Sequence, residues 1–185
     1  RVDPAVDAAI IASATTLQWR RDPTVVVDVD EFVASSRVAL ESDPDEAVHL
    51  IERCREAVRN YGGDLLTGEQ DDWLISRRDE LRDLYRHVLR LLVTALIDDD
   101  RGGEALGPAR ALVRADPFDE AAHRLRIEAH RAADDRAGAV RAFHECATIL
   151  ERELGLEPST ATRQALDDLL DRPPAAKAAA NRTSA

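Results

Sequence analysis

The stretches EALGPARALVRADP (residues 104–117) and GAVRAFHECATILE (residues 138–151) carry one pattern twice, 34 residues apart. In each stretch a small residue is followed four and seven positions later by two further residues. These positions are Ala105, Ala109 and Leu112 in the first stretch, and Ala139, Phe143 and Cys146 in the second. Residues at this spacing share one helical face, and a small side chain there lets a second helix approach closely.

A period of about 34 residues is typical of the tetratricopeptide repeat, a helix–turn–helix unit that stacks to form a binding surface. An earlier copy of the pattern, Ala47, Ile51 and Cys54, lies 58 residues before Ala105, so a longer insertion separates it from the others. The spacing predicts an irregular helical array and favours a recognition module over a catalytic pocket.

The composition limits the classes of protein to which this chain can belong. A chain of 185 residues corresponds to one domain, or to one domain with part of a neighbour. Hydrophobic residues make up 44% of the chain and aromatic residues only 4%, so aliphatic side chains must fill the core. The net charge of −11 repels a phosphate backbone, which excludes a free-standing DNA-binding domain. Cys54 and Cys146 lie on predicted apolar faces and are interpreted as buried thiols.

The pattern of the chain predicts an all-α fold of about seven helices with a short N-terminal β-hairpin. Residues 17–19 and 25–29 are strand-like, and residues 20–24 are expected to form the turn between them. Apolar periodicity and capping residues predict the helices. Their approximate ranges are 28–40, 44–60, 71–97, 104–115, 119–133, 136–154 and 158–171. Residues 61–68, with three glycines, are expected to form a compact packed loop.

Four motifs occur in a distinctive order: residues 27–32 (VDVDEF), residues 61–66 (YGGDLL) followed by Trp73, residues 116–124 (DPFDEAAHR) and residues 153–158 (ELGLEP). With these motifs the chain resembles, over about residues 28–170, the bacterial transcriptional activator domain of the Streptomyces antibiotic regulatory protein family. The resemblance implies a tetratricopeptide-like domain at residues 28–171. By the same resemblance, residues 1–27, which include the hairpin, are expected to be the remnant or end of a preceding winged-helix-like domain. Residues 172–185 are expected to be disordered.

The resemblance also implies a function. Such domains follow an OmpR-like winged-helix domain and help a regulator to self-associate or to contact other proteins. We therefore expect a cytoplasmic protein-interaction and oligomerisation domain of a transcriptional regulator, forming a homodimer or binding the transcription machinery. It would reach DNA only through a separate domain, with no membrane contact of its own. The alternative is a repeat-type scaffold domain of a bacterial protein that does not bind DNA, including a membrane-anchored one.

The best candidate for a partner-binding surface is a row of arginines at strict four-residue spacing: Arg78, Arg82, Arg86 and Arg90. Such a row forms a ridge along one helix that could grip an acidic partner or a phosphate. The competing interpretation is a solvated helix face, because three acids lie among the arginines and can pair with them locally: Asp79, Glu80 and Asp83.

Four residues are predicted to anchor the fold: Tyr61, Trp73, Pro117 and Phe143. Trp73 is expected to pack against the loop at residues 61–68 rather than to serve as a ligand platform. The sequence offers no catalytic, cofactor-binding or metal-binding residues. Its five histidines include no pair four residues apart, and it contains no phosphate-binding glycine motif or nucleophile elbow. We therefore expect neither an enzyme nor a cofactor.

Overall fold

The structure, a computed structural model, describes residues 10–19, 27–43, 46–69 and 71–171. Its described residues form seven helices in chain order. They are α2 (Asp28–Leu40), α3 (Ala47–Asn60), α4 (Asp72–Asp98), α5 (Gly102–Ala115), α6 (Glu120–Ala132), α7 (Arg136–Leu154) and α8 (Thr160–Asp171). The predicted all-helical array is confirmed, and the helix ends lie within a few residues of those expected from capping and periodicity.

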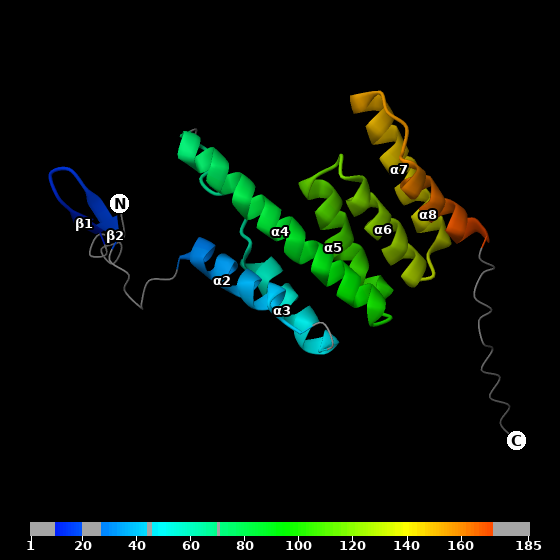
Figure 1. The fold of residues 1–185 in the computed structure, drawn as a ribbon, viewed down its shortest axis with the longest axis horizontal. Coiled ribbons are helices and arrows are strands. Elements are labelled where there is room, and N and C mark those ends of the chain that lie inside the picture. The colour runs from blue at the N-terminus through cyan, green and yellow to red at the C-terminus, as the bar shows by residue number, and fades with distance from the viewer. Residues whose placement is uncertain (1–9, 20–26, 44–45, 70, 172–185) are drawn as a thin grey trace, which may run out of the picture.

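Each helix from α2 to α7 packs against the next one along the chain, and α8 returns to pack on α6 and α7. Figure 1 shows α4 to α8 lying side by side, with α2 and α3 beside α4. The central helix α4, 27 residues long, contacts helices on both sides of it and extends beyond the end of α5. It is therefore the element that joins the first helical pair to the rest of the array.

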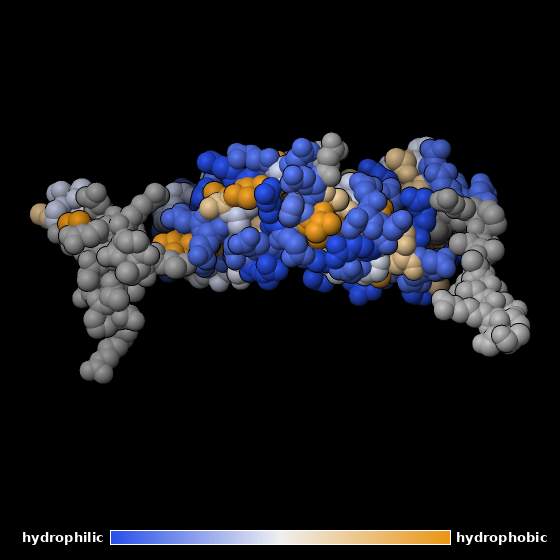
Figure 2. All heavy atoms as spheres, turned by 90° about the horizontal axis from the view of Figure 1, so that it is seen from below, coloured by the Kyte–Doolittle hydropathy of each residue, from blue (hydrophilic) through white to orange (hydrophobic). Residues whose placement is uncertain are grey.

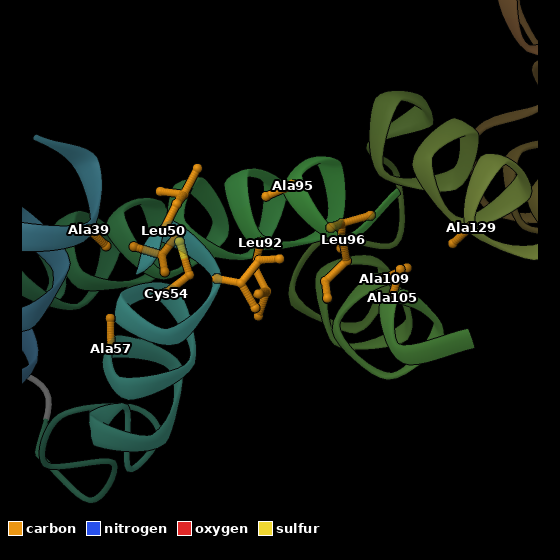
Figure 3. Packing of buried hydrophobic residues seen from close by; sticks show 13 residues of the cluster. Ala39, Leu50, Cys54, Ala57, Leu92, Ala95, Leu96, Ala105, Ala109 and Ala129 are labelled. Carbon is orange, nitrogen blue, oxygen red and sulfur yellow. The ribbon is translucent and has the colours of Figure 1, made fainter. Parts of the chain in front are cut away.

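Small residues let the helices approach closely, as the repeated pattern predicts. The main hydrophobic cluster joins Ala39 and Cys54 to Ala105, Ala109 and further residues of α4 and α6. In Figure 3 the small side chains of α3 and α5 lie on either side of the larger leucines of α4. Most members of the repeated pattern are fully buried: Ile51, Cys54, Ala105, Ala109, Leu112, Ala139 and Cys146. The repeat is thus a packing pattern, in which small residues set the spacing between helices.

Aspartate caps mark the start of two helices, and a glycine marks the end of one. The Asp119 carboxylate accepts a hydrogen bond from the backbone N–H of Ala121 at 2.9 Å, at the start of α6. The Asp135 carboxylate accepts one from Gly138 at 2.8 Å, at the start of α7. Gly155 ends α7 in the left-handed conformation, with φ at 65°, which a residue without a Cβ adopts at no steric cost.

The strand pairing that the sequence predicted for the N-terminal hairpin is wrong. The strand β2 (Leu17–Trp19) pairs antiparallel with an earlier strand, β1 (Ile10–Ala12), and Ser13 and Thr16 close the turn between them. Val29, expected in the second strand, lies in the first turn of α2, where acidic residues favour a helix start. Residues 20–26 lie outside the described residues, as does the tail at 172–185 that was expected to be disordered.

We predict that Gly102→Ala destabilises the domain by about 1–3 kcal/mol, the usual range for overpacking. A Cβ at Gly102 would overlap the backbone of Ala132 and lie 2.5 Å from the nitrogen of Ala133, because the start of α5 abuts the end of α6. Urea unfolding measures the change. Gly103→Ala is the matched control, since its Cβ would meet no atom within 4 Å. Equal unfolding midpoints for the two variants would contradict this close contact.

Candidate interaction surface

The four arginines of α4 all reach neighbouring segments of the same chain. The Arg78 guanidinium donates to the backbone carbonyls of Leu65 at 2.5 Å and Glu69 at 2.6 Å, and also to that of Leu66. All three carbonyls lie between α3 and α4, two of them within residues 61–68 and that of Glu69 directly after them. We call residues 61–68 the glycine loop. Arg78 therefore fastens the glycine loop to the first part of α4.

Arg82 holds the same loop through a carboxylate. Its Nε donates to Asp64 Oδ1 at 2.8 Å and its Nη2 donates to Asp64 Oδ2, which is the bidentate geometry of a strong ion pair. These hydrogen bonds hold the pKa of Asp64 below its usual range. The carboxylate therefore stays charged at neutral pH, and Arg82 is engaged with it.

Arg86 and Arg90 reach in the other direction, to residues 116–119, which we call the α5–α6 turn. Arg86 donates to Asp116 and to Asp83, both at 2.5 Å. Arg90 donates to Asp119, whose other carboxylate oxygen caps α6. The arginine row thus connects α4 to two distant segments. Both interpretations from sequence placed it on an outer face, and neither anticipated these long-range partners.

Tyr61 lies at the junction of three helices. Its ring stacks on Tyr85 with centroids 4.0 Å apart and an interplanar angle of 14°, and it lies 5.0 Å from the ring of Phe32. Burial and the neighbouring Asp64 carboxylate raise the pKa of Tyr61 to about 12. The ring joins α2 and α4 at the end of α3, and its hydroxyl donates to Asp64 at 3.3 Å.

Trp73 does not anchor the glycine loop, contrary to the expectation from sequence. Its side chain is 63% exposed. Leu74 and Leu81, seven residues apart on α4, are buried instead, and this periodicity turns Trp73 toward solvent. The carbonyl contacts of Arg78 fasten the loop in its place.

The other two predicted anchors lie at helix junctions. The carbonyl of Pro117 accepts a hydrogen bond from Nε2 of His123, a fully buried residue, at 2.9 Å. Phe143 of α7 is partly buried and packs in the cluster of Ile127 and Ala139 with Leu166 of α8.

A groove of about 610 Å³ opens where the arginine row meets the α5–α6 turn. We call it the turn groove, and it is lined by Asp83, Arg86, His87, Arg90, Asp116, Phe118 and Asp119. Phe118 is 47% exposed, an uncommon position for one of only three phenylalanines. Sequence reasoning did not select this residue. The available signal was an aromatic residue inside the polar turn motif Asp-Pro-Phe-Asp.

A second cleft, of about 400 Å³, lies over the Tyr61–Tyr85 stack. It is bounded by the Asp64–Arg82 pair on one side and by Ala111 and Arg114 of α5 on the other. Both clefts are therefore built around contacts of the arginine row.

Three further features of the described residues concern reactive thiols, metal ligands and membrane-spanning helices. Burial raises the pKa of the Cys54 and Cys146 thiols to about 11, so neither is a ready nucleophile. Among the residues that the structure describes, no group of three His, Cys, Asp or Glu could hold a metal ion. None of the described helices is both long and apolar enough to cross a membrane.

We predict that Arg78→Ala loosens the glycine loop and costs about 1–3 kcal/mol, because carbonyl contacts made by a charged donor are lost. Urea unfolding gives the energy, and mass spectrometry after limited digestion with a glutamate-specific protease reports cleavage at Glu69. Trp73→Ala is the control and should change stability by less than about 0.5 kcal/mol, as expected of an exposed side chain. A larger loss in the Trp73 variant would restore tryptophan as the anchor.

Solved structures with a similar fold include the following two proteins. Mycobacterium tuberculosis EmbR, solved in complex with a low-affinity phosphopeptide, superposes with a TM-score of 0.68 at 19% sequence identity. The match covers 91% of this chain and 44% of the EmbR chain, so this chain spans less than half of EmbR.

The second protein is a Plasmodium falciparum FK506-binding protein, through its C-terminal tetratricopeptide-repeat domain. It superposes with a TM-score of 0.52 at 15% identity, covering 77% of this chain and 88% of that one. These identities show a shared fold alone, and that fold is tetratricopeptide-like. No curated protein matches the sequence.

The sequence profile of the bacterial transcriptional activator domain matches residues 27–170, more than three quarters of the chain. The matched region contains all of α2 to α7 and nearly all of α8, including the arginine row and the α5–α6 turn. The chain therefore belongs to the bacterial transcriptional activator domain family, as its motifs and helical order indicated.

Proposed function

We propose that this chain is the protein-interaction domain of a bacterial transcriptional regulator. It acts in the cytoplasm, without catalysis of its own, and reaches promoters through a separate DNA-binding domain. Its partner is a second copy of the regulator or a component of the transcription machinery. The observation that carries this proposal is the match of residues 27–170 to the activator-domain family.

Charge supports a protein partner rather than direct contact with DNA. The chain has a formal net charge of −11, and its most regular basic feature, the arginine row, is engaged by carboxylates and carbonyls of the chain itself. Figure 2 shows a mostly hydrophilic face with small, separate hydrophobic spots. Such a surface suits a regulated, reversible contact better than an obligate interface, which is usually more apolar.

The arginine row has a supporting role in this proposal. A phosphopeptide accompanies EmbR in its structure, and Arg–phosphate pairing is a common recognition mode. Here an incoming phosphate would have to displace Asp64, Asp116 or Asp119 from its arginine. We therefore assign Arg78 and Arg82 to positioning the glycine loop, and Arg86 and Arg90 to positioning the wall of the turn groove.

A reporter assay tests the proposed function. Residues 27–171 are fused to a monomeric heterologous DNA-binding domain whose site lies upstream of a bacterial reporter promoter. We expect reporter expression to change several-fold relative to the DNA-binding domain alone, because the fused domain recruits or pairs with protein. A fusion carrying Leu89→Asp, which places a charge in the core, is the unfolded control.

Sedimentation velocity of the isolated domain complements the reporter and separates self-association from recruitment. Reporter expression that does not change, together with a strict monomer at about 100 µM, would contradict the proposal, because a useful regulatory contact is tighter than this.

A further inference from the structure

We propose that the turn groove is the docking surface for a basic segment of a partner protein, with Phe118 and Asp83 as the two contact residues. The segment carries Lys or Arg side chains interleaved with apolar ones. This inference rests on the proposed function and specifies the chemical class of partner that the domain would bind. It concerns a surface made by α4 and the α5–α6 turn.

The turn that carries Phe118 is held from several directions. The Phe118 N–H donates to Asp116 Oδ1 at 3.2 Å, and Arg86 holds the other oxygen of that carboxylate at 2.5 Å. Arg90 holds Asp119, and the buried His123 holds the carbonyl of Pro117 at 2.9 Å. Because these bonds fix the backbone of the turn, binding at Phe118 loses little backbone conformational entropy.

The charges of the turn groove favour a cationic binding segment. Arg86 pairs with both Asp116 and Asp83, and Arg90 pairs with Asp119. Asp83 is the most accessible of these charges, with a side chain that is 65% exposed. The lining holds three aspartates, two arginines and His87, which gives a formal charge of −1 with the histidine neutral, on a chain of −11. This potential attracts Lys and Arg and repels phosphate groups and acidic peptides.

An exposed aromatic ring and a carboxylate lining one groove match the two parts of a long basic side chain. The alkyl stem of Arg or Lys covers the ring, and its charged head pairs with the carboxylate or lies over the ring face. An apolar neighbour in the partner segment can cover the remaining exposed edge of Phe118. Exposed aromatic residues in well-ordered pockets often dominate the binding energy of protein interfaces.

The test uses two double variants with the same change in net charge. The groove variant combines Phe118→Ala with Asp83→Asn. The control combines Trp73→Ala, at another exposed aromatic residue, with Asp79→Asn, at an aspartate one helical turn before Asp83 on α4. The aspartates are matched in exposure, at 65% and 64%, and each pairs with the arginine three residues later. Thermal unfolding first verifies that both variants remain folded.

The probe is a short fluorescein-labelled peptide of alternating Arg and Leu, and its acidic twin alternates Glu and Leu. Fluorescence anisotropy measures the Kd for the wild type and both variants at physiological salt. We expect the groove variant to weaken binding of the basic peptide by about tenfold or more. The control should weaken it by less than about twofold, and the acidic twin should bind no protein.

Three results would overturn the inference. The first is equal weakening in both variants, which would mean that the peptide senses only net charge. The second is a wild type that does not bind the basic peptide below about 1 mM. The third is a wild type that binds the acidic twin as tightly as the basic peptide. A positive reporter assay combined with any of these would leave the proposed function standing and remove the turn groove as its surface.

Discussion

The organisation of this domain depends on the arginine row of α4. At four-residue spacing these side chains leave one helix face, yet Arg78 and Arg82 bind the glycine loop, while Arg86 and Arg90 bind the α5–α6 turn. Both segments connect helices and lie at the surface of the domain. Charge-assisted hydrogen bonds that are partly shielded from water are stronger than exposed pairs, so the row can hold the loops in fixed positions.

Close helix packing supplies the frame on which the arginine row acts. Small residues such as Cys54, Ala105 and Ala109 set the spacing of α3 and α5 against α4, and the backbone of Ala132 meets Gly102. Because this frame fixes α4 relative to α5 and α6, Arg86 and Arg90 meet Asp116 and Asp119 across about 30 residues of chain. The turn groove is therefore a product of both the packing and the ion pairs, and it forms where they meet.

Local signals predicted the helices well. The Gly102–Gly103 pair, the Asp-Pro turn and Gly155 identified the ends of α4, α5 and α7 to within a few residues. The 34-residue pattern identified buried positions such as Ala139 and Cys146. Long-range contacts were not predictable. Nothing near Arg86 or Arg90 in the sequence indicates partners about 30 residues away. Trp73 was misplaced although local periodicity bears on it, because the adjacent Leu74 and not Trp73 lies on the buried face of α4. The strand partner of residues 17–19 is local and was missed because the valines at 25–29 form a more strand-like pattern than residues 10–12.

The most direct test of the central claim is a double-mutant cycle on Arg86→Met and Asp116→Asn, measured by urea unfolding. Asparagine keeps an acceptor for the Phe118 N–H, so the cycle isolates the ion pair between α4 and the α5–α6 turn. If the arginine row holds this turn in place, the coupling energy is about 1 kcal/mol or more. A coupling energy below about 0.3 kcal/mol would show that the pair is only a solvated surface contact and would contradict the account.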